Sequence, residues 1–180
     1  MPVLTKPPKP TTKPTTVLFV DDGSIPNNPK LPFVLYRGAI DLTGTPDPEE
    51  VVEKTLRRNQ WGSLWRNGIY PYVHYHSMIH EVLGIARGRA KVRFGGPRGE
   101  DLDITAGDVA VLPAGTGHQR LFASPDLMVI GAYPPTGTYN LCQGTPAEYP
   151  RARAAISKVP LPETDPIHGA DGPLMRLWHA

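Results

Sequence analysis

Alternation of apolar and polar positions is the main pattern of the chain and predicts short β-strands. Residues 90–94 alternate most clearly, with Ala90, Val92 and Phe94 on one side and basic residues on the other. Side chains two apart share a face of a strand, so this segment predicts a sheet with one packed face and one solvated face. Similar runs predict further strands at 17–20, 33–40, 70–78, 81–85, 109–113, 118–123 and 127–133.

Helical signals occur in two segments. Residues 45–48 read Thr-Pro-Asp-Pro and are followed by Glu49 and Glu50, which complement a helix N-terminus, so we expect a helix that ends near Asn59. Residues 145–148 form a capping box and predict a second helix, to about residue 158. The proline-punctuated remainder is expected to be extended and to cover the outside of the domain. Strands without β-α-β alternation predict an all-β antiparallel sandwich or barrel.

Composition fits one domain of short strands and turns. The chain has 180 residues with 22 Pro and 18 Gly, and 39% of its residues are hydrophobic. Residues 1–16 contain Pro, Thr and Lys and predict a disordered or extended arm, which leaves 17–180 as the domain. The net charge is +2, and the arm alone contributes three positive charges from its lysines. The domain itself therefore carries a net charge close to zero and has no basic face for nucleic acid.

Cysteine and hydropathy bear on the location of the protein. Cys142 is the one cysteine, so no internal disulfide can form, which is typical of the reducing cytoplasm. No apolar run approaches the ~18 residues of a membrane span. The first residues lack the apolar segment of a secretory signal. A cytoplasmic protein without a membrane partner is therefore expected.

Three histidines and a glutamate have the spacing of a metal site. His74 and His76 share one face of the predicted strand, with Cα atoms roughly 7 Å apart. A turn at 77–80 would let Glu81 face the same point, and the glycine-containing turn 114–117 would deliver His118. Imidazole nitrogens with a carboxylate suit Fe, Mn, Co, Ni or Zn rather than Ca or Mg.

These residues fit two motifs of the cupin superfamily. The first motif is formed by Gly68, His74, His76, Glu81 and Gly88. The second is formed by Gly107, Pro113, Gly115 and His118, with Phe122 in place of the usual terminal Asn. Segments near both ends, NNPKLP and VPLPETDP, further resemble the YjlB-type family of bacterial cupins. The resemblance implies a jelly-roll β-barrel with one or two peripheral helices, and a divalent transition metal held by His74, His76, Glu81 and His118.

Two residues near these ligands are candidates for catalysis. Tyr72 lies two residues before His74 and should face the same interior, where its phenol could bind substrate, act as an acid or fill space. His80 lies in the predicted turn. It is a candidate ligand or catalytic group, or a turn residue that orients a ligand by a hydrogen bond.

Residues farther from the ligands could contact substrate. Alternation after His118 places Arg120 and Phe122 on the metal-facing side, where Arg120 could anchor an anionic substrate or form a salt bridge. Trp61 and Trp65 are expected to close one end of the barrel, with a place at a pocket mouth as the alternative.

The family resemblance implies a metal-dependent enzyme acting on a small organic molecule, with dioxygenase-type oxidation as the first choice. A lyase, decarboxylase or isomerase would use the same metal. A non-catalytic metal-containing module that binds a small molecule is the hypothesis from another class. The resemblance also implies a homodimer paired through sheet edges.

Overall fold

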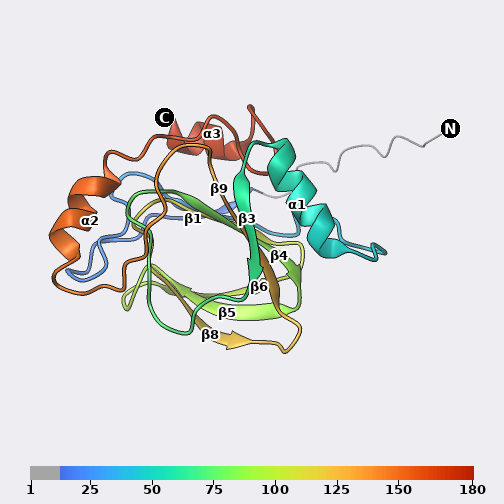
Figure 1. Cartoon of the computed structure of the whole chain (residues 1–180), viewed down its shortest axis with the longest axis horizontal. Helices are drawn as coiled ribbons and strands as arrows, with labels where there is room; N and C mark the ends of the chain where they lie inside the picture. Colours follow the sequence, from blue (N-terminus) through green and yellow to red (C-terminus); the bar gives the residue numbers. More distant parts are fainter. Residues whose placement is uncertain (1–12) are drawn as a thin grey trace.

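The computed structural model describes residues 13–180, which form two antiparallel β-sheets with helices outside them (Figure 1). The larger sheet contains, in spatial order, β1 (Thr15–Val17), β2 (Phe33–Tyr36), β7 (Val109–Leu112), β4 (Glu81–Arg87), β9 (Met128–Tyr133) and β3 (Gly62–Asn67). The smaller sheet contains β6 (Glu100–Thr105), β5 (Arg89–Phe94) and β8 (His118–Ala123). The helices are α1 (Pro48–Arg58), α2 (Tyr149–Ile156) and α3 (Pro173–Trp178).

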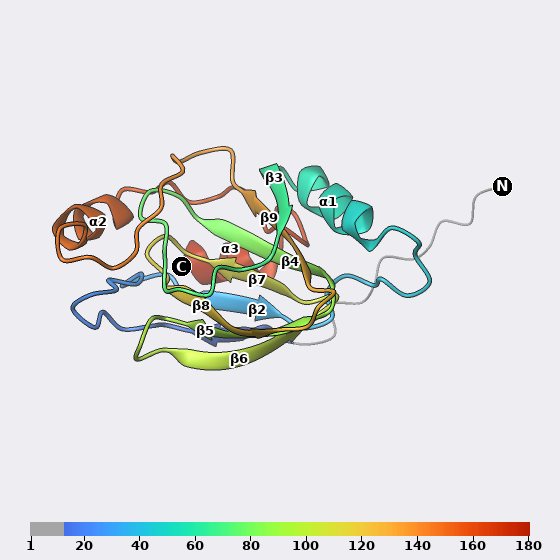
Figure 2. The same ribbon diagram turned by 60° about the horizontal axis from the view of Figure 1, so that its bottom comes forward.

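This arrangement is a jelly-roll and confirms the predicted all-β cupin-type fold. The two sheets face each other across the interior, with β5 and β6 opposite β2, β7 and β4 (Figure 2). Within residues 13–180 the sheets share no strand, so the barrel is not a closed ring of hydrogen bonds.

Strand β4 lies in the middle of the larger sheet and is buried on both faces. Leu83 and Ile85 point between the sheets, where they join a cluster with Val92 and Phe94 of β5. Each such apolar side chain contributes roughly 1.5–3 kcal/mol when it leaves water. The inner face therefore fixes the strand that begins with Glu81.

The outer face of the same strand is covered by helices. Val82 packs in a second cluster with Val52 of α1 and Trp178 of α3. Gly84 lets α1 approach closely, because a Cβ there would meet Val52 Cγ1 at 2.6 Å. A sheet covered on both sides explains the unbroken burial of residues 81–86.

Helix α1 confirms the prediction from residues 45–59. The Asp47 side chain accepts a hydrogen bond from the Glu50 N–H at 3.0 Å, Pro48 is the first helical residue and Asn59 caps the C-terminus. The predicted N-terminal signals are therefore the ones that the structure uses.

The C-terminal tail contains a helix that the sequence did not predict. Helix α3 begins at Pro173 and buries Leu174 and Trp178 against the larger sheet. Asp165 has no exposed surface, and it accepts hydrogen bonds from the Leu174 N–H at 3.1 Å and from the Tyr36 hydroxyl. The described chain thus has three helices rather than one or two, because tertiary packing stabilises a segment of weak local signal.

Several predicted strands differ from the observed elements. In place of a strand at 70–78, His74 and Tyr75 make isolated bridges to His118 and Cys142. Strand β3 follows α1 directly and was not predicted. Strand β1 begins at Thr15, inside the predicted arm of residues 1–16, and residues 1–12 of that arm lie outside the described part.

The second predicted helix begins later than expected. The Glu148 carboxylate does reach back to the Thr145 N–H at 2.9 Å, but it also accepts from the Gln143 N–H at 3.0 Å. The chain turns at 146–148, and α2 begins at Tyr149. None of the helices within residues 13–180 is long and apolar enough to cross a membrane.

Candidate metal centre

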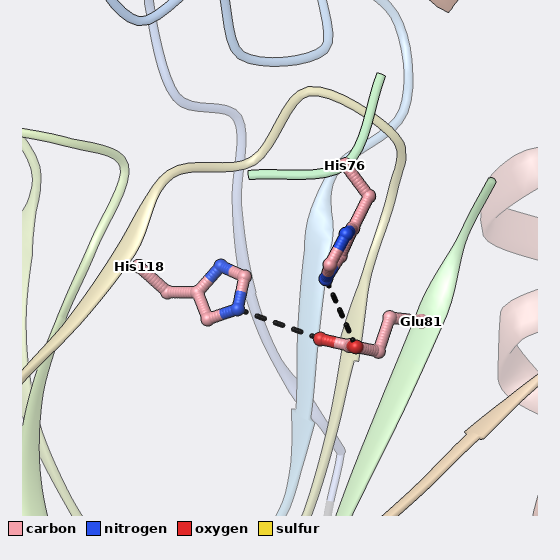
Figure 3. Close-up of side chains that lie close together, drawn as sticks. All are labelled: His76, Glu81 and His118. Carbon is pink, nitrogen blue, oxygen red and sulfur yellow. Dashed lines mark ion pairs between the residues drawn. The ribbon is translucent and has the colours of Figure 1, made fainter. Parts of the chain in front are cut away.

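Three of the four predicted ligands meet at one point between the sheets. His76 comes from the segment before β4, Glu81 is the first residue of β4 and His118 is the first residue of β8 (Figure 3). One donor atom from each lies within 4.8 Å of the others, and all three residues are buried. Together they form a group that could hold a metal ion.

Backbone pairing brings these three residues together. His74 and His118 exchange two backbone hydrogen bonds, of 3.1 and 2.9 Å, and the Gly115 N–H donates to the His76 carbonyl at 2.7 Å. The segment that carries the paired histidines is thereby fastened to the turn between β7 and β8. Gly115 has a φ of +97°, and a Cβ there would lie 2.6 Å from the Asn27 carbonyl oxygen. Glycine is required at this turn for both reasons.

Each histidine near this point is oriented by a main-chain carbonyl. The Nδ1 atoms of His74, His76 and His118 lie 3.0, 2.5 and 3.0 Å from carbonyl oxygens of Tyr72, Asn140 and Thr116, respectively. A carbonyl only accepts, so Nδ1 carries the proton in each ring and Nε2 presents its lone pair. This is the tautomer in which histidine binds metals through Nε2.

The spacing of the donor atoms fits a transition metal. His76 Nε2 lies 3.1 Å from one Glu81 oxygen, and His118 Nε2 lies 3.4 Å from the other. Ligands about 2.1 Å from an ion in octahedral or tetrahedral geometry are roughly 3.0–3.4 Å apart. Two lone pairs that face a carboxylate at these distances need a cation or a proton between them.

The electrostatics of Glu81 also indicate that a cation belongs at this point. Glu81 is 2% exposed, and its Oε1 has no hydrogen-bond partner. Burial alone would raise the pKa of Glu81, but the neighbouring His76 and His118 outweigh it and hold this pKa well below its usual range. Burial lowers the pKa of His76, but Glu81 outweighs it and raises this pKa overall. A buried carboxylate with an unbonded oxygen fits a cation ligand.

His74 lies beside this group but outside it. Its ring is 4.0 Å from the His118 ring, between centroids, and 6.2 Å from the His76 ring. Burial, with a smaller contribution from His118, lowers the pKa of His74 to about 3. This histidine is therefore neutral at physiological pH, and its role as a fourth ligand stays a prediction.

A cavity of about 680 Å³ opens beside the three ligands. Its wall contains Trp65, Tyr70, Tyr133 and Tyr139 together with His74 and the three ligands. The rings of Tyr139 and Tyr133 lie 5.1 and 6.2 Å from the His76 ring. The cavity gives a small molecule access to the ligands through an aromatic wall.

Tyr133 is a functional candidate that the sequence analysis missed. The Trp65 Nε1–H donates to the Tyr133 hydroxyl at 3.0 Å, and burial raises the pKa of Tyr133. The indole lies over Gly131, where a Cβ would come within 1.9 Å of it. The register Val82–Ala132 puts Tyr133 next to Glu81 on the inner face. An apolar strand that ends in tyrosine before two prolines was the available signal.

The structure separates the predicted catalytic residues from one another. His80 has no exposed surface, and its Nδ1 accepts from the Ala114 N–H at 2.9 Å while its ring packs on Trp178. Burial lowers the pKa of His80 to about 4. Tyr72 is 39% exposed and stacks on Tyr70 at 4.9 Å, at the outer side of the cavity wall. The catalytic roles of His80 and Tyr72 stay predictions.

The prediction for strand β8 is partly wrong. Val92 pairs with Arg120, whereas Lys91 pairs with Phe122, so the register shifts between them. This irregularity turns Phe122 outward, where it is 50% exposed and lies under the Arg89 guanidinium. Arg120 is half-buried and is not among the residues that line the 680 Å³ cavity. Its role as a substrate anchor stays a prediction.

Comparison with known proteins identifies a relative that matches over most of the chain. The uncharacterized protein YjlB of Bacillus subtilis (strain 168) is 41% identical over 163 residues, which cover 91% of this chain and 95% of that protein. No model of a protein family matches the chain.

Two solved structures show weaker similarity. A conserved protein with a double-stranded beta-helix domain from Klebsiella pneumoniae has a TM-score of 0.37 and 14% identity, and the match covers 74% of this chain and 81% of that one. Acireductone dioxygenase from Bacillus anthracis, with a cadmium ion in its active center, has a TM-score of 0.38 and 14% identity, covering 62% and 80%.

Proposed function

The chain belongs to the YjlB family of cupin proteins, and on that premise we propose that it is a metal-dependent enzyme acting on a small organic molecule. The observation that carries this proposal is the buried group of His76, Glu81 and His118 at the wall of a cavity. Dioxygenase-type oxidation is the leading reaction, because two histidines and one carboxylate with open positions are typical of non-haem iron oxygenases.

The ligands have distinct tasks in this proposal. His76 and His118 present Nε2 lone pairs that their main-chain partners hold in place, and Glu81 supplies the negative charge. His74, whose ring lies beside that of His118, would be the fourth ligand. When bound, the metal supplies polarisation of a substrate oxygen or, as iron, activation of O₂. Iron, manganese, nickel and zinc all suit this donor set.

Tyr133 is the residue best placed to handle a proton. Its hydroxyl oxygen already accepts from Trp65, and the nearby Glu81 carboxylate helps to raise its pKa, so its own hydrogen faces Glu81 and would reach a substrate oxygen bound there. Because burial raises its pKa, Tyr133 acts as a hydrogen-bond donor or acid at neutral pH and not as a phenolate base. Tyr72 supports the site indirectly, since its carbonyl orients His74.

The cavity wall indicates the kind of substrate. Aromatic side chains surround the ligands, and the charged residues of the wall are Glu81 and Arg66. Arg66 is bound to Glu53 of α1 through its Nε at 2.6 Å, which takes up much of its charge. We therefore propose a substrate with an apolar, largely uncharged body and one or two oxygens that reach the metal.

Metal content is the first test. Elemental analysis of the purified protein should find nearly one equivalent of metal, and His76→Ala should lose it. The matched control is His179→Ala, at an exposed histidine in the tail. Absence of metal from the wild type even after reconstitution would contradict the proposal.

The identity of the metal directs the second test. Iron would justify measuring oxygen consumption with candidate substrates, and Tyr133→Phe should then lower turnover without changing iron content. Manganese, nickel or zinc would favour a lyase, decarboxylase or isomerase at the same site.

A non-catalytic binding module is the second candidate. The observation that favours it is the apolar, aromatic wall, in which Tyr133 is protonated at neutral pH and therefore not ready to accept a proton. Tight binding of a ligand without turnover of any substrate would support this alternative. The homodimer and the cytoplasmic location stay predictions of the sequence.

A further inference from the structure

We infer that Asn140 is a positioning residue that holds His76 in its metal-binding tautomer and fastens one wall of the cavity to the metal centre. Asn140 lies between β9 and α2, far from the two sequence motifs. The inference rests on the proposed metal-dependent function, because it concerns the geometry of a proposed ligand.

The main chain of Asn140 contacts the ligand directly. Its carbonyl oxygen lies 2.5 Å from His76 Nδ1 and accepts a hydrogen bond from the N–H of that atom. This contact directs His76 Nε2 toward the Glu81 carboxylate, 3.1 Å away. A different backbone path at residue 140 would leave both the tautomer and the ring orientation of His76 unspecified.

The side chain of Asn140 fixes that backbone path. Its Oδ1 accepts from the Ser77 and Met78 N–H groups at 3.0 and 3.2 Å, and its Nδ2 donates to the Ser77 hydroxyl at 2.7 Å. These partners directly follow His76 in the chain. The carboxamide therefore binds the two residues after the ligand while the carbonyl binds the ligand itself. The carboxamide both accepts and donates, so it satisfies all of these groups.

Neighbouring contacts extend this attachment into the cavity wall. The Thr138 N–H donates to the Met78 carbonyl at 3.0 Å, and Cys142 exchanges two backbone hydrogen bonds of 2.9 Å with Tyr75. Between these contacts, Tyr139 places its ring 5.1 Å from the His76 ring, at the wall of the cavity. A shift of Asn140 would therefore move a metal ligand and the substrate wall together.

The test compares Asn140→Ala with Gln143→Ala, an exposed amide residue of the same segment. Metal affinity is measured by competition with a chelator, using the metal found in the wild-type protein. We expect Asn140→Ala to bind that metal about 10- to 100-fold more weakly, which is the usual effect of losing a partner of a metal ligand. Gln143→Ala should bind as the wild type does. Equal affinities for Asn140→Ala and wild type would overturn the inference.

A second readout does not depend on metal. Long-range ¹H–¹⁵N spectra of the metal-free protein report which imidazole nitrogen carries the proton. His76 should be protonated at Nδ1 in the wild type and in Gln143→Ala, and should be a mixture of tautomers in Asn140→Ala. A wild-type protein that binds no metal would defeat the proposed function, whereas an unchanged His76 signal in Asn140→Ala would defeat this inference.

Ser77→Ala gives a second variant if Asn140→Ala does not fold. It removes the hydroxyl that accepts from Asn140 Nδ2 but keeps the Ser77 and Met78 N–H groups that donate to Asn140 Oδ1. We expect a loss of about three- to tenfold in metal affinity, which corresponds to one hydrogen bond. Wild-type affinity in Ser77→Ala would overturn the inference in that case.

Discussion

Two buried carboxylates, Asp165 and Glu81, have opposite surroundings. Asp165 accepts from the Tyr36 hydroxyl and from the N–H groups of Ile167, His168 and Leu174, at 2.8–3.1 Å for the N–H groups. Glu81 faces two imidazole nitrogens, and its Oε1 has no hydrogen-bond partner. The first carboxylate is satisfied by donors and joins the tail to the sheet, whereas the second needs a cation. The partners of a buried charge thus distinguish a structural carboxylate from a ligand.

Removing Asp165 should have the largest effect on folding. Asp165→Ala leaves the N–H groups of Ile167 and His168 and the Tyr36 hydroxyl without their acceptor, and the Leu174 N–H keeps only the Tyr36 hydroxyl oxygen. We therefore expect the free energy of unfolding to fall by about 3–5 kcal/mol. Urea denaturation measures this, with Asp171→Ala, at an exposed acid of the same tail, as the control. Folded Asp165→Ala protein should still bind metal. Loss of metal at unchanged stability would reverse the roles assigned to the two carboxylates.

Removing the charge of Glu81 should affect metal binding and not folding. Glu81→Gln should weaken metal affinity by more than about 100-fold, because even partners of ligands account for 10- to 100-fold. The metal-free protein should keep its stability within about 1 kcal/mol, since Oε1 has no hydrogen bond to lose and the neutral amide removes a buried charge, which offsets the lost attraction between Oε2 and His76. Chelator competition and urea denaturation check the two parts. A large loss of stability without metal would show that Glu81 is structural like Asp165.

Lowering the pH should reduce the free energy of unfolding through His80, the residue before Glu81, at pH values where Glu81 itself does not titrate. Burial lowers the pKa of His80 from 6.5 to about 4, so the folded state binds fewer protons than the unfolded state between these values. Its contribution to stability is complete above pH 6.5 and is lost as pH falls toward 4. We expect a loss of about 2 kcal/mol between pH 6.5 and 5 for the metal-free protein. Denaturation at several pH values measures it, and a flat profile would contradict the assignment.

A variant of His80 separates its contribution from that of other groups. His80→Asn keeps an acceptor near the Ala114 N–H but does not titrate in this range. The decline in stability between pH 6.5 and 5 should be shallower in this variant. The same decline in both proteins would assign the effect to another group, such as His74.

The smallest expected effect concerns the hydrogen bond at the cavity wall. Trp65→Phe keeps most of the ring packed over Gly131 but removes the N–H that donates to Tyr133. We expect a loss of about 0.5–1.5 kcal/mol in stability and an unchanged metal content. Calorimetry and elemental analysis measure the two quantities. Loss of metal in Trp65→Phe would mean that the aromatic wall also builds the metal centre.

The parts of the site that depend on local spacing could be predicted from the sequence. The grouping of His76, Glu81 and His118 was predictable from their spacing, since Glu81 and His118 begin strands, although His76 lies outside any strand and not on the predicted one at 70–78. Helix α1 was also predictable, since Asp47 and Pro48 are local signals. The prediction that Phe122 faces the metal was wrong, because the irregularity in β8 depends on its pairing with β5.

The parts that depend on distant partners could not be predicted. Asn140 contacts His76 only through the fold, and Tyr133 lies beside Glu81 only through the register of β9. Helix α3 forms against a sheet whose strands end well before it in the chain. Each of these features needs the tertiary structure, because its sequence signal is weak or absent.

The main-chain partners of the three histidines determine which positions around the metal centre can vary in sequence during evolution. Every residue type carries a carbonyl, so substitutions at Tyr72 and Thr116 can alter the side chain without removing the group that orients His74 or His118. Position 140 differs, because there the side chain sets the path of the carbonyl. Evolutionary drift around this centre should therefore be uneven. Two of its three imidazole supports can vary in sequence, whereas the third depends on one carboxamide.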